Sequence, residues 1–212
     1  MSIFIDSADL NQIQASCELG WVKGVTTNPL LLSQAGMPAD SLLAAIKQLC
    51  SGPVFYQLMA KDFDQMIREA YKAQEILDQQ LILKLPPNDL GFRVCAQLST
   101  KFICCPTAIY SPAQALIARE AGAQYIAIYV NRASRLLGDG IKLVRDTSAV
   151  LQGCRTEILA ASIKSPLEAA DAVSAGAQHL TLPYETLIQM SSHEFSEAAV
   201  NQFQKNGLGL NL

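Results

Sequence analysis

Lys84 is the residue of this sequence that could most clearly do chemistry, because it is the single cation in the apolar run LILKLP at positions 81–86. A lysine side chain is rarely buried completely, since removing the ammonium from water disfavours its charged form. Burial would therefore lower the pKa of Lys84, and a neutral amine can attack a carbonyl carbon and form a Schiff base. The alternative is a lysine on an edge strand whose ammonium reaches solvent.

The composition excludes several classes of protein. Of 212 residues, 50% are hydrophobic and 17% are charged, which excludes a disordered chain. The net charge of -3, without any Lys/Arg cluster, gives no reason to expect nucleic-acid binding. The start MSIFIDSADL lacks the features of a signal peptide, and no apolar run reaches membrane-spanning length. We therefore expect one cytoplasmic domain over residues 1–212, with no nucleic-acid or membrane partner.

The cysteines and histidines predict neither a metal site nor disulfides. No C-x-x-C pair occurs, and His179 and His193 lie far apart in the sequence. His179 precedes an apolar strand and is expected to be structural. Most of the thiols are expected to be small core residues in a reducing compartment. The cysteines are Cys17, Cys50, Cys95, Cys104, Cys105 and Cys154.

Short β-rich runs alternate with amphipathic helical patterns such as 38–50 and 62–78. Strands that alternate with helices pair in parallel, with the helices covering the sheet. Eight strands are predicted, at residues 3–6, 24–28, 54–59, 81–85, 102–107, 125–130, 157–161 and 179–182.

An internal repeat favours a closed barrel. Residues 111–129 (SPAQALIAREAGAQYIAIY) and 165–183 (SPLEAADAVSAGAQHLTLP) read as copies of one helix-plus-strand unit. Each copy opens with Ser-Pro, which suits a helix N-cap and first turn, and each has a glycine where the helix should end. Eight such units predict an α/β fold, a (β/α)8 TIM barrel with an extra C-terminal helix. The alternative is an open doubly wound sheet, but no G-x-G-x-x-G fingerprint follows the first strand.

The functional face of such a barrel lies at the C-terminal ends of its strands. Individual polar residues there have structural explanations: Asp6 could cap a helix, 26–28 could form a turn before Pro29, and Lys164 could be a surface lysine. Their convergence from seven strands predicts an active site. These residues are Asp6, Thr26, Thr27, Asn28, Gln57, Lys84, Thr107, Tyr129, Asn131, Arg132, Ser162 and Lys164.

This rim suits Schiff-base chemistry on a carbonyl substrate. A protonated imine on Lys84 would withdraw electrons from the neighbouring carbon–carbon bond, so that this bond can break or form. Gln57, Thr107 and Tyr129 could hold a water for proton transfer, with Tyr129 as the strongest acid–base candidate. Asp6 and Asn28 could contact the amine and substrate hydroxyls.

Three further residues predict an anion site. Arg132, Ser162 and Lys164, together with the helix start at 165–166, offer the donors that a phosphate prefers. A basic site on an acidic protein fits a small phosphorylated substrate better than a polyanion.

Four segments resemble the transaldolase family and are most similar to its small branch, fructose-6-phosphate aldolase. They are GVTTNP at 24–29, KLP at 84–86, YVNR at 129–132 and AASIK at 160–164. The resemblance runs in the same order from Asp6 to about Pro183, and the motifs are specific as a set.

The resemblance implies a class I enzyme that needs neither a metal nor another cofactor, with Lys84 as the Schiff-base nucleophile. A small phosphorylated sugar or hydroxyketone would be its substrate. The residues expected to be catalytic are Lys84, Tyr129, Gln57, Thr107 and Asp6, and those expected to bind substrate are Asn28, Thr26, Arg132, Ser162 and Lys164.

Two positions separate the branches of the family. Transaldolases typically carry glutamate at the position of Gln57 and phenylalanine at that of Tyr129, so this pair resembles the aldolases. This chain departs from the aldolase branch at 87–89, at 104–106 and at Ile128, where a proline is common. These departures leave the specificity for the acceptor undetermined. A helix is predicted at 195–205 within the tail 193–212. In the family such a helix packs on a neighbouring subunit, commonly in decamers, which implies a homo-oligomer.

Three functions follow as hypotheses. The first is reversible cleavage of fructose 6-phosphate to dihydroxyacetone and glyceraldehyde 3-phosphate. The second is a transaldolase that moves a dihydroxyacetone unit between sugar phosphates. The third is a noncovalent phosphosugar isomerase or an inactive binding protein, in which Lys84 is only structural.

Overall fold

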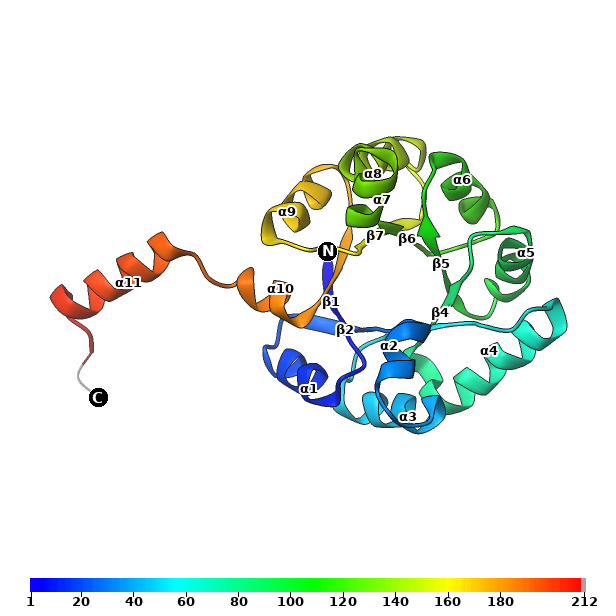
Figure 1. The fold of residues 1–212 in the computed structure, drawn as a ribbon, viewed down its shortest axis with the longest axis horizontal. Helices are drawn as coiled ribbons and strands as arrows, with labels where there is room; N and C mark the ends of the chain where they lie inside the picture. The colour runs from blue at the N-terminus through cyan, green and yellow to red at the C-terminus, as the bar shows by residue number, and fades with distance from the viewer. Residues whose placement is uncertain (211–212) are drawn as a thin grey trace.

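The computed structural model describes residues 1–210 and shows eight parallel strands closed into a barrel. The strands pair in sequence order, β1 to β8, and β8 pairs with β1 (Figure 1). Helices surround this barrel, so the predicted (β/α)8 TIM barrel is confirmed and the open doubly wound sheet is wrong. A closed barrel has no edge strand, which also removes the edge-strand explanation of Lys84.

The eight strands are β1 (Ser2–Asp6), β2 (Val22–Thr26), β3 (Val54–Gln57), β4 (Leu81–Leu85), β5 (Ile103–Ile109), β6 (Tyr125–Tyr129), β7 (Glu157–Ala161) and β8 (His179–Leu182). The helices are α1 (Leu10–Glu18), α2 (Pro29–Gln34), α3 (Ala39–Leu49), α4 (Phe63–Leu77), α5 (Asp89–Leu98), α6 (Pro112–Glu120), α7 (Val130–Leu137), α8 (Gly140–Val150), α9 (Pro166–Ser174), α10 (Tyr184–Gln189) and α11 (Glu194–Asn206), with a 3-10 turn at Asp78–Gln80.

Strands β2 and β3 end earlier than predicted, and the reason is local hydrogen bonding. β2 ends at Thr26 because Asn28 caps α2, accepting from the backbone N–H groups of Leu30 and Leu31. β3 ends at Gln57 because the N–H groups of Met59 and Ala60, just beyond it, donate to the carboxylate of Glu69 in α4 and not to β4. Asp9, rather than Asp6, caps α1.

The repeated units have the predicted ends. Ser111 and Ser165 cap α6 and α9, each with proline in the first turn. Gly122 and Gly176 follow these helices with φ angles of 80° and 111°, in the left-handed region that favours glycine.

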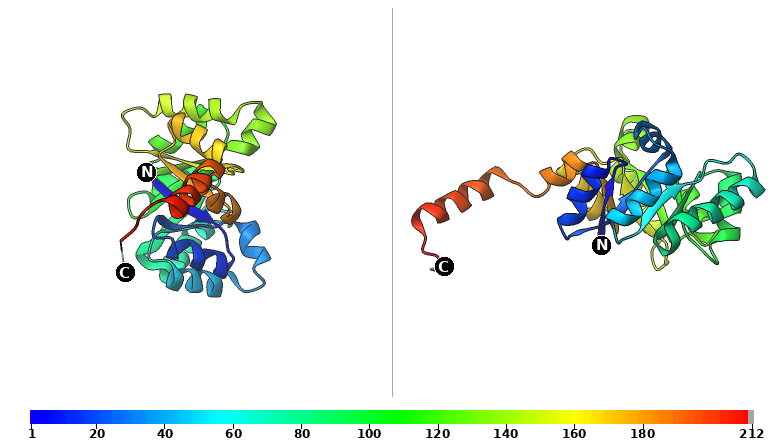
Figure 2. Two further views of the ribbon diagram at one scale, coloured as in Figure 1. Left: turned by 90° about the vertical axis from the view of Figure 1, so that its left-hand side faces the viewer. Right: turned by 90° about the horizontal axis from the view of Figure 1, so that it is seen from below.

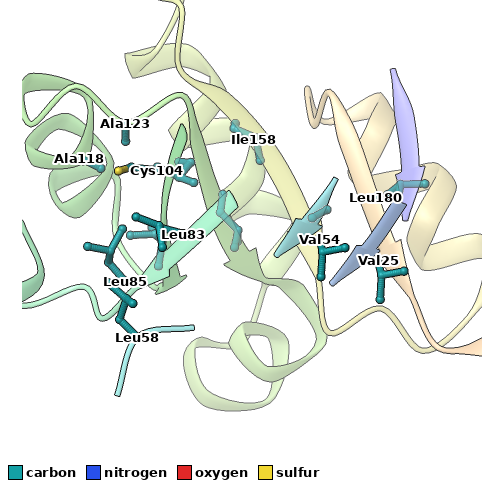
Figure 3. Packing of buried hydrophobic residues seen from close by; sticks show 14 of the residues in the cluster. Val25, Val54, Leu58, Leu83, Leu85, Cys104, Ala118, Ala123, Ile158 and Leu180 are labelled. Atoms are coloured by element: carbon teal, nitrogen blue, oxygen red, sulfur yellow. The ribbon is translucent and has the colours of Figure 1, made fainter. Parts of the chain in front are cut away.

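Side chains alternate between two apolar layers because successive residues of a strand face opposite ways. The inner layer fills the barrel with Phe4, Phe55, Ile82, Cys105, Ala127 and Leu159. Phe4 and Phe55 pack edge to face, with ring centroids 5.1 Å apart. The outer layer lies between strands and helices, and Figure 3 shows part of it, including Val25, Val54 and Leu83. The inner layer is the floor beneath the polar rim.

The N-terminal end of the barrel interior holds a second polar group, in which His179 Nε2 lies 2.9 Å from Glu157 Oε2. His179 is buried and packs against Phe4 and Tyr125. This environment fits the structural role expected for His179. All six cysteines are free.

The C-terminal helix α11 lies apart from the barrel (Figure 2). None of its residues is buried, and Phe195 and Phe203 are 73% and 69% exposed. The helix was predicted at 195–205 and is found at Glu194–Asn206. The predicted tail extends to residue 212, and its residues 211 and 212 lie outside the described part of the chain. Within residues 1–210, no helix is both long and apolar enough to span a membrane.

The glycine after α6 should be more sensitive to alanine than a matched glycine after α1. Gly20 and Gly122 have φ angles of 76° and 80°, but a Cβ on Gly122 would lie 2.5 Å from Ser99 Oγ, whereas the space beside Gly20 is open. We expect Gly20→Ala to cost about 1–2 kcal/mol through backbone strain, and Gly122→Ala to cost more because of the added clash. Urea unfolding measures both changes, and equal losses would contradict this account.

Candidate active site

A cavity of about 450 Å³ opens at the C-terminal ends of the strands. It is lined by nine of the ten residues that were expected to be catalytic or to bind substrate. They are Asp6, Thr26, Asn28, Gln57, Lys84, Tyr129, Arg132, Ser162 and Lys164. The tenth, Thr107, is buried behind the wall, where its hydroxyl lies 3.5 Å from Tyr129 Oη. The structure therefore brings nine of these residues to one cavity, and the role of each stays a prediction.

The convergence has a simple cause in the strand alternation. Lys84 follows the inner-layer residue Ile82 by two positions, and Gln57 follows Phe55 in the same way. Residues two apart on a strand share a face, so both polar side chains rise from the apolar floor into the cavity. The same spacing places Tyr129 above Ala127.

Lys84 is 4% exposed, and its Nζ donates a 2.7 Å hydrogen bond to the backbone carbonyl of Thr27. Among the described residues, Lys84 belongs to no ion pair. A buried amine without a paired carboxylate is held by one neutral acceptor, which a reacting carbonyl compound can replace.

Gln57 is the direct neighbour of Lys84 across the β3–β4 ladder. Adjacent strands lie about 4.8 Å apart, so the amide of Gln57 stands beside the base of the lysine side chain. The next backbone group strengthens this link, because Leu58 N donates to Lys84 O at 2.9 Å. Any group bound to Lys84 Nζ would therefore have Gln57 as a neighbour.

Cys105 is the neighbour of Lys84 on the other side, in β5. Complete burial raises the pKa of the Cys105 thiol to about 12, and the nearby Lys84 cation only partly opposes this rise. The thiol therefore stays protonated near neutral pH and does not compete with the lysine as a nucleophile.

A chain of hydroxyls holds Asp6. Thr26 Oγ1 donates to Asp6 Oδ1 at 2.7 Å, and Thr181 Oγ1 lies 2.5 Å from Thr26 Oγ1. Because Thr26 gives its single proton to Asp6, Thr181 must donate to Thr26. Thr181 also lines the cavity and was missed by the sequence analysis, although its position two residues after His179 in β8 places it on the inner face.

Asn28 has two functions at this rim. Its Oδ1 caps α2, as the turn explanation of 26–28 requires, and its side chain also lines the cavity. The cap fixes the carbonyl end of the amide, so the Nδ2 donor is the part that could serve a ligand.

Tyr129 is half-buried and lines the cavity. The guanidinium of Arg132 packs over its ring, with Cζ 4.8 Å from the ring centroid. The hydroxyl of Thr107 lies 3.5 Å from Tyr129 Oη. Thr107 directly precedes Ala108, which has a φ of 61° and lies where the register of the β5–β6 pairing shifts. A left-handed alanine costs about 1–2 kcal/mol, and strain of this kind is common where a strand re-aims a side chain at a site.

The outer part of the cavity carries Arg132, Ser162 and Lys164. Within residues 1–210, neither Arg132 nor Lys164 belongs to an ion pair, so both charges are available to an anion. Ser162 has a φ of 59°, a second strained residue at this rim. Asn131, expected at the same rim, instead points to α9, where its Nδ2 donates to Glu168 Oε1.

The loop after β3 is held by a helix carboxylate that the sequence analysis missed. Glu69 of α4 accepts hydrogen bonds from Tyr56 Oη at 2.8 Å and from the backbone N–H groups of Met59 and Ala60. Burial, followed by the Glu69 hydrogen bond, raises the pKa of Tyr56, so its hydroxyl remains a donor. Glu69 thus fixes the residues on both sides of Gln57.

No group of three or more His, Cys, Asp or Glu side chains within residues 1–210 is arranged to hold a metal ion. The cavity residues instead offer an amine, carboxylate, amides, hydroxyls and two cations. This set can bind a polyhydroxylated carbonyl compound that carries an anion.

The family model described as transaldolase/fructose-6-phosphate aldolase matches residues 3–209. The chain belongs to this family. The family is enzymatic and acts on phosphorylated sugars, and the predicted resemblance is thereby confirmed.

Relatives of similar length support the assignment. A protein from Symbiobacterium thermophilum is 36% identical over 209 residues, covering 97% of this chain and 96% of its own. A protein from Geobacter metallireducens is 34% identical over 209 residues, covering 97% of each chain. Both are named probable transaldolase.

Solved structures show likeness in the fold alone. A mandelate oxidase variant with an FMN adduct superposes with a TM-score of 0.62 at 15% identity. The match covers 87% of this chain and 64% of that one, so the chain spans less than two thirds of the mandelate oxidase. A mandelate oxidase with (S)-2-phenylpropionate gives a TM-score of 0.60 at 14% identity, covering 82% of this chain and 59% of the other.

Proposed function

We propose that the protein is a Schiff-base aldolase that reversibly cleaves fructose 6-phosphate to dihydroxyacetone and glyceraldehyde 3-phosphate. The observation that carries the proposal is a buried Lys84 in a cavity that also bears Arg132 and Lys164, none of the three belonging to an ion pair within residues 1–210. The lysine provides the covalent chemistry and the cations select the phosphorylated substrate.

The first step joins the amine to the sugar. The ammonium of Lys84 gives up one proton and the free amine attacks C2 of the open-chain ketose. The hydroxyl of the resulting carbinolamine then takes up one proton and leaves as water. The product is a protonated imine that carries C1 to C6 of the substrate. Asp6, whose carboxylate accepts a hydrogen bond from Thr26, is the residue that we assign to binding the sugar hydroxyls during this step.

The second step breaks the bond between C3 and C4. A base removes the proton of the C4 hydroxyl, and C4 of the substrate becomes the aldehyde carbon of glyceraldehyde 3-phosphate. The electrons of the broken C3–C4 bond enter the imine and give an enamine. Asp6 and Tyr129 are the proton carriers that we assign to this step. Asp6 ends β1 and Tyr129 ends β6, and both line the cavity, so one can contact hydroxyls while the other acts through water.

The third step releases the three-carbon product. The enamine takes a proton at carbon, and one water hydrolyses the regenerated imine to dihydroxyacetone and free Lys84. This water replaces the one lost in the first step, so the cycle balances. Gln57 stands beside Lys84 and Tyr129 faces the same cavity, and we assign them to positioning this water. No metal or other cofactor enters the scheme.

A transaldolase is the second candidate, and the names of the relatives favour it. The two reactions share the enamine and differ in its fate. In a transaldolase the enamine attacks an acceptor aldose phosphate before water reaches the imine. The pair Gln57 and Tyr129, which resembles the aldolases, is the reason that we place hydrolysis first.

Incubation with fructose 6-phosphate alone separates the two candidates. We expect dihydroxyacetone and glyceraldehyde 3-phosphate in equal amounts, measured by enzyme-coupled reduction of each product. Lys84→Met should abolish both, because it keeps an unbranched side chain, one atom shorter, but removes the amine. Product formation only after an acceptor aldose phosphate is added would assign the protein as a transaldolase.

Gln57→Glu should move the enzyme toward transfer. A carboxylate next to Lys84 would pair with its cation and change the water near the imine. We expect the ratio of transfer to dihydroxyacetone release to rise about tenfold, which corresponds to about 1.4 kcal/mol between the two barriers. Gln57→Ala, which removes the amide without adding charge, is the control; an equal rise in both variants would show that the carboxylate is not the cause.

We also propose that α11 packs on another copy of this chain, in a homo-oligomer such as the family's decamer. Phe195, Ala199 and Phe203 lie on one face of α11 at i, i+4 and i+8 spacing, and both phenylalanines are exposed. Burial of this face offers about 1.5–3 kcal/mol for each large side chain.

The combined variant Phe195→Ser and Phe203→Ser tests this assembly. Sedimentation velocity should show a multi-subunit particle for the native chain and smaller species for the variant, with the barrel still folded by circular dichroism. A native chain that sediments as a monomer at micromolar concentration would rule the proposal out.

A further inference from the structure

Glu168 places a carboxylate beside the proposed phosphate site, although carboxylate and phosphate are both negatively charged. It lies in the first turn of α9, directly after the loop that carries Ser162 and Lys164. A negative charge at this place opposes anion binding through Coulomb repulsion. A carboxylate at this position must therefore contribute something to the site that offsets its repulsion of the anion.

The hydrogen bonds of Glu168 indicate that role. Oε2 accepts the backbone N–H of Lys164 at 2.7 Å, and Oε1 accepts Asn131 Nδ2 at 3.2 Å. The backbone N–H of Glu168 donates in turn to Ser165 Oγ, so the carboxylate stands on a capped and fixed helix start. Hydrogen bonds to a charged carboxylate are about twice as strong as neutral ones.

The two partners of Glu168 belong to different elements of the anion site. Lys164 lies in the loop after β7, only two residues from Ser162, whereas Asn131 lies in α7 and directly precedes Arg132. One carboxylate therefore links the loop that offers the hydroxyl and ammonium to the helix that offers the guanidinium. Apart from Glu168, no described side chain hydrogen-bonds to both segments.

We propose that Glu168, together with Asn131, is a positioning pair that sets the spacing of Arg132 against Ser162 and Lys164. Glu168 does not touch the substrate. It holds two phosphate-binding segments at one separation, and thereby makes the enzyme prefer phosphorylated over unphosphorylated aldehydes. This inference rests on the proposed anion site but not on the Schiff-base step.

Kinetics in the direction of aldol formation test the pair, with dihydroxyacetone as donor. We expect Glu168→Ala to raise KM for glyceraldehyde 3-phosphate about tenfold, while kcat and the KM for unphosphorylated glyceraldehyde stay unchanged. Asn131→Ala should raise the same KM, by less, because the loop bond to Lys164 remains. Glu185→Ala, at an exposed glutamate in the first turn of α10, is the matched control.

Rescue by Glu168→Gln separates positioning from charge. Glutamine keeps an acceptor for Lys164 N, and the amide of Asn131 can rotate to accept from its Nε2. We therefore expect near-native KM for the phosphorylated aldehyde in Glu168→Gln. If Glu168 acted only through its charge, both Glu168→Ala and Glu168→Gln would lower this KM, and that result would overturn the proposal. Equal changes with both aldehydes, or none, would overturn it too.

Calorimetric titration with inorganic phosphate removes the dependence on turnover. The native protein and Glu168→Gln should bind phosphate more tightly than Glu168→Ala and Asn131→Ala. A native protein that binds phosphate but does not cleave fructose 6-phosphate would contradict the proposed reaction and leave the positioning role standing. A native protein that does not bind phosphate, or variants that bind it equally well, would contradict the role itself.

Discussion

The alternation of side chains in a closed barrel is the constraint on which the site depends. Ile82 belongs to the apolar layer inside the barrel, and Lys84, two residues later, must therefore point inward above it. With no sheet edge through which the ammonium could reach solvent, the lysine is enclosed and its Nζ binds a backbone carbonyl. The same rule places Asp6 above Phe4, Gln57 above Phe55 and Tyr129 above Ala127.

The strand ends need a second device, because the residues that follow each strand leave the regular ladder. Glu69 holds the loop after Gln57, and Glu168 holds the loop after Ser162. Gln114 of α6 does the same after β5, accepting from Tyr110 N at 2.9 Å. Each of these three helices thus fixes the loop that precedes it. The site side chains are therefore carried by a rigid scaffold, which keeps their spacing during a reaction.

Much of the fold and the site could be predicted because the signals are local. The Ser-Pro openings and the glycines of the repeat mark helix ends, and the run around Lys84 marks a buried strand. The hydrogen bond between Asn131 and Glu168 was out of reach, since the two residues are 37 apart in the sequence and belong to different helices, α7 and α9. Thr181 could have been found, because period-two alternation in β8 places it on the inner face with His179. The placement of Gln57 opposite Lys84 depends on the register of β3 against β4, which no local pattern encodes.

Borohydride reduction of the protein with dihydroxyacetone tests the central claim most directly, because only an imine becomes a stable secondary amine. Mass spectrometry of the digested protein should find the three-carbon adduct on Lys84 alone, and none of the solvent-exposed lysines should carry it at the same substrate concentration. An adduct on Lys84 would establish the covalent mechanism for either fate of the enamine. An enzyme that turns over substrate yet yields no adduct on Lys84 would contradict the account.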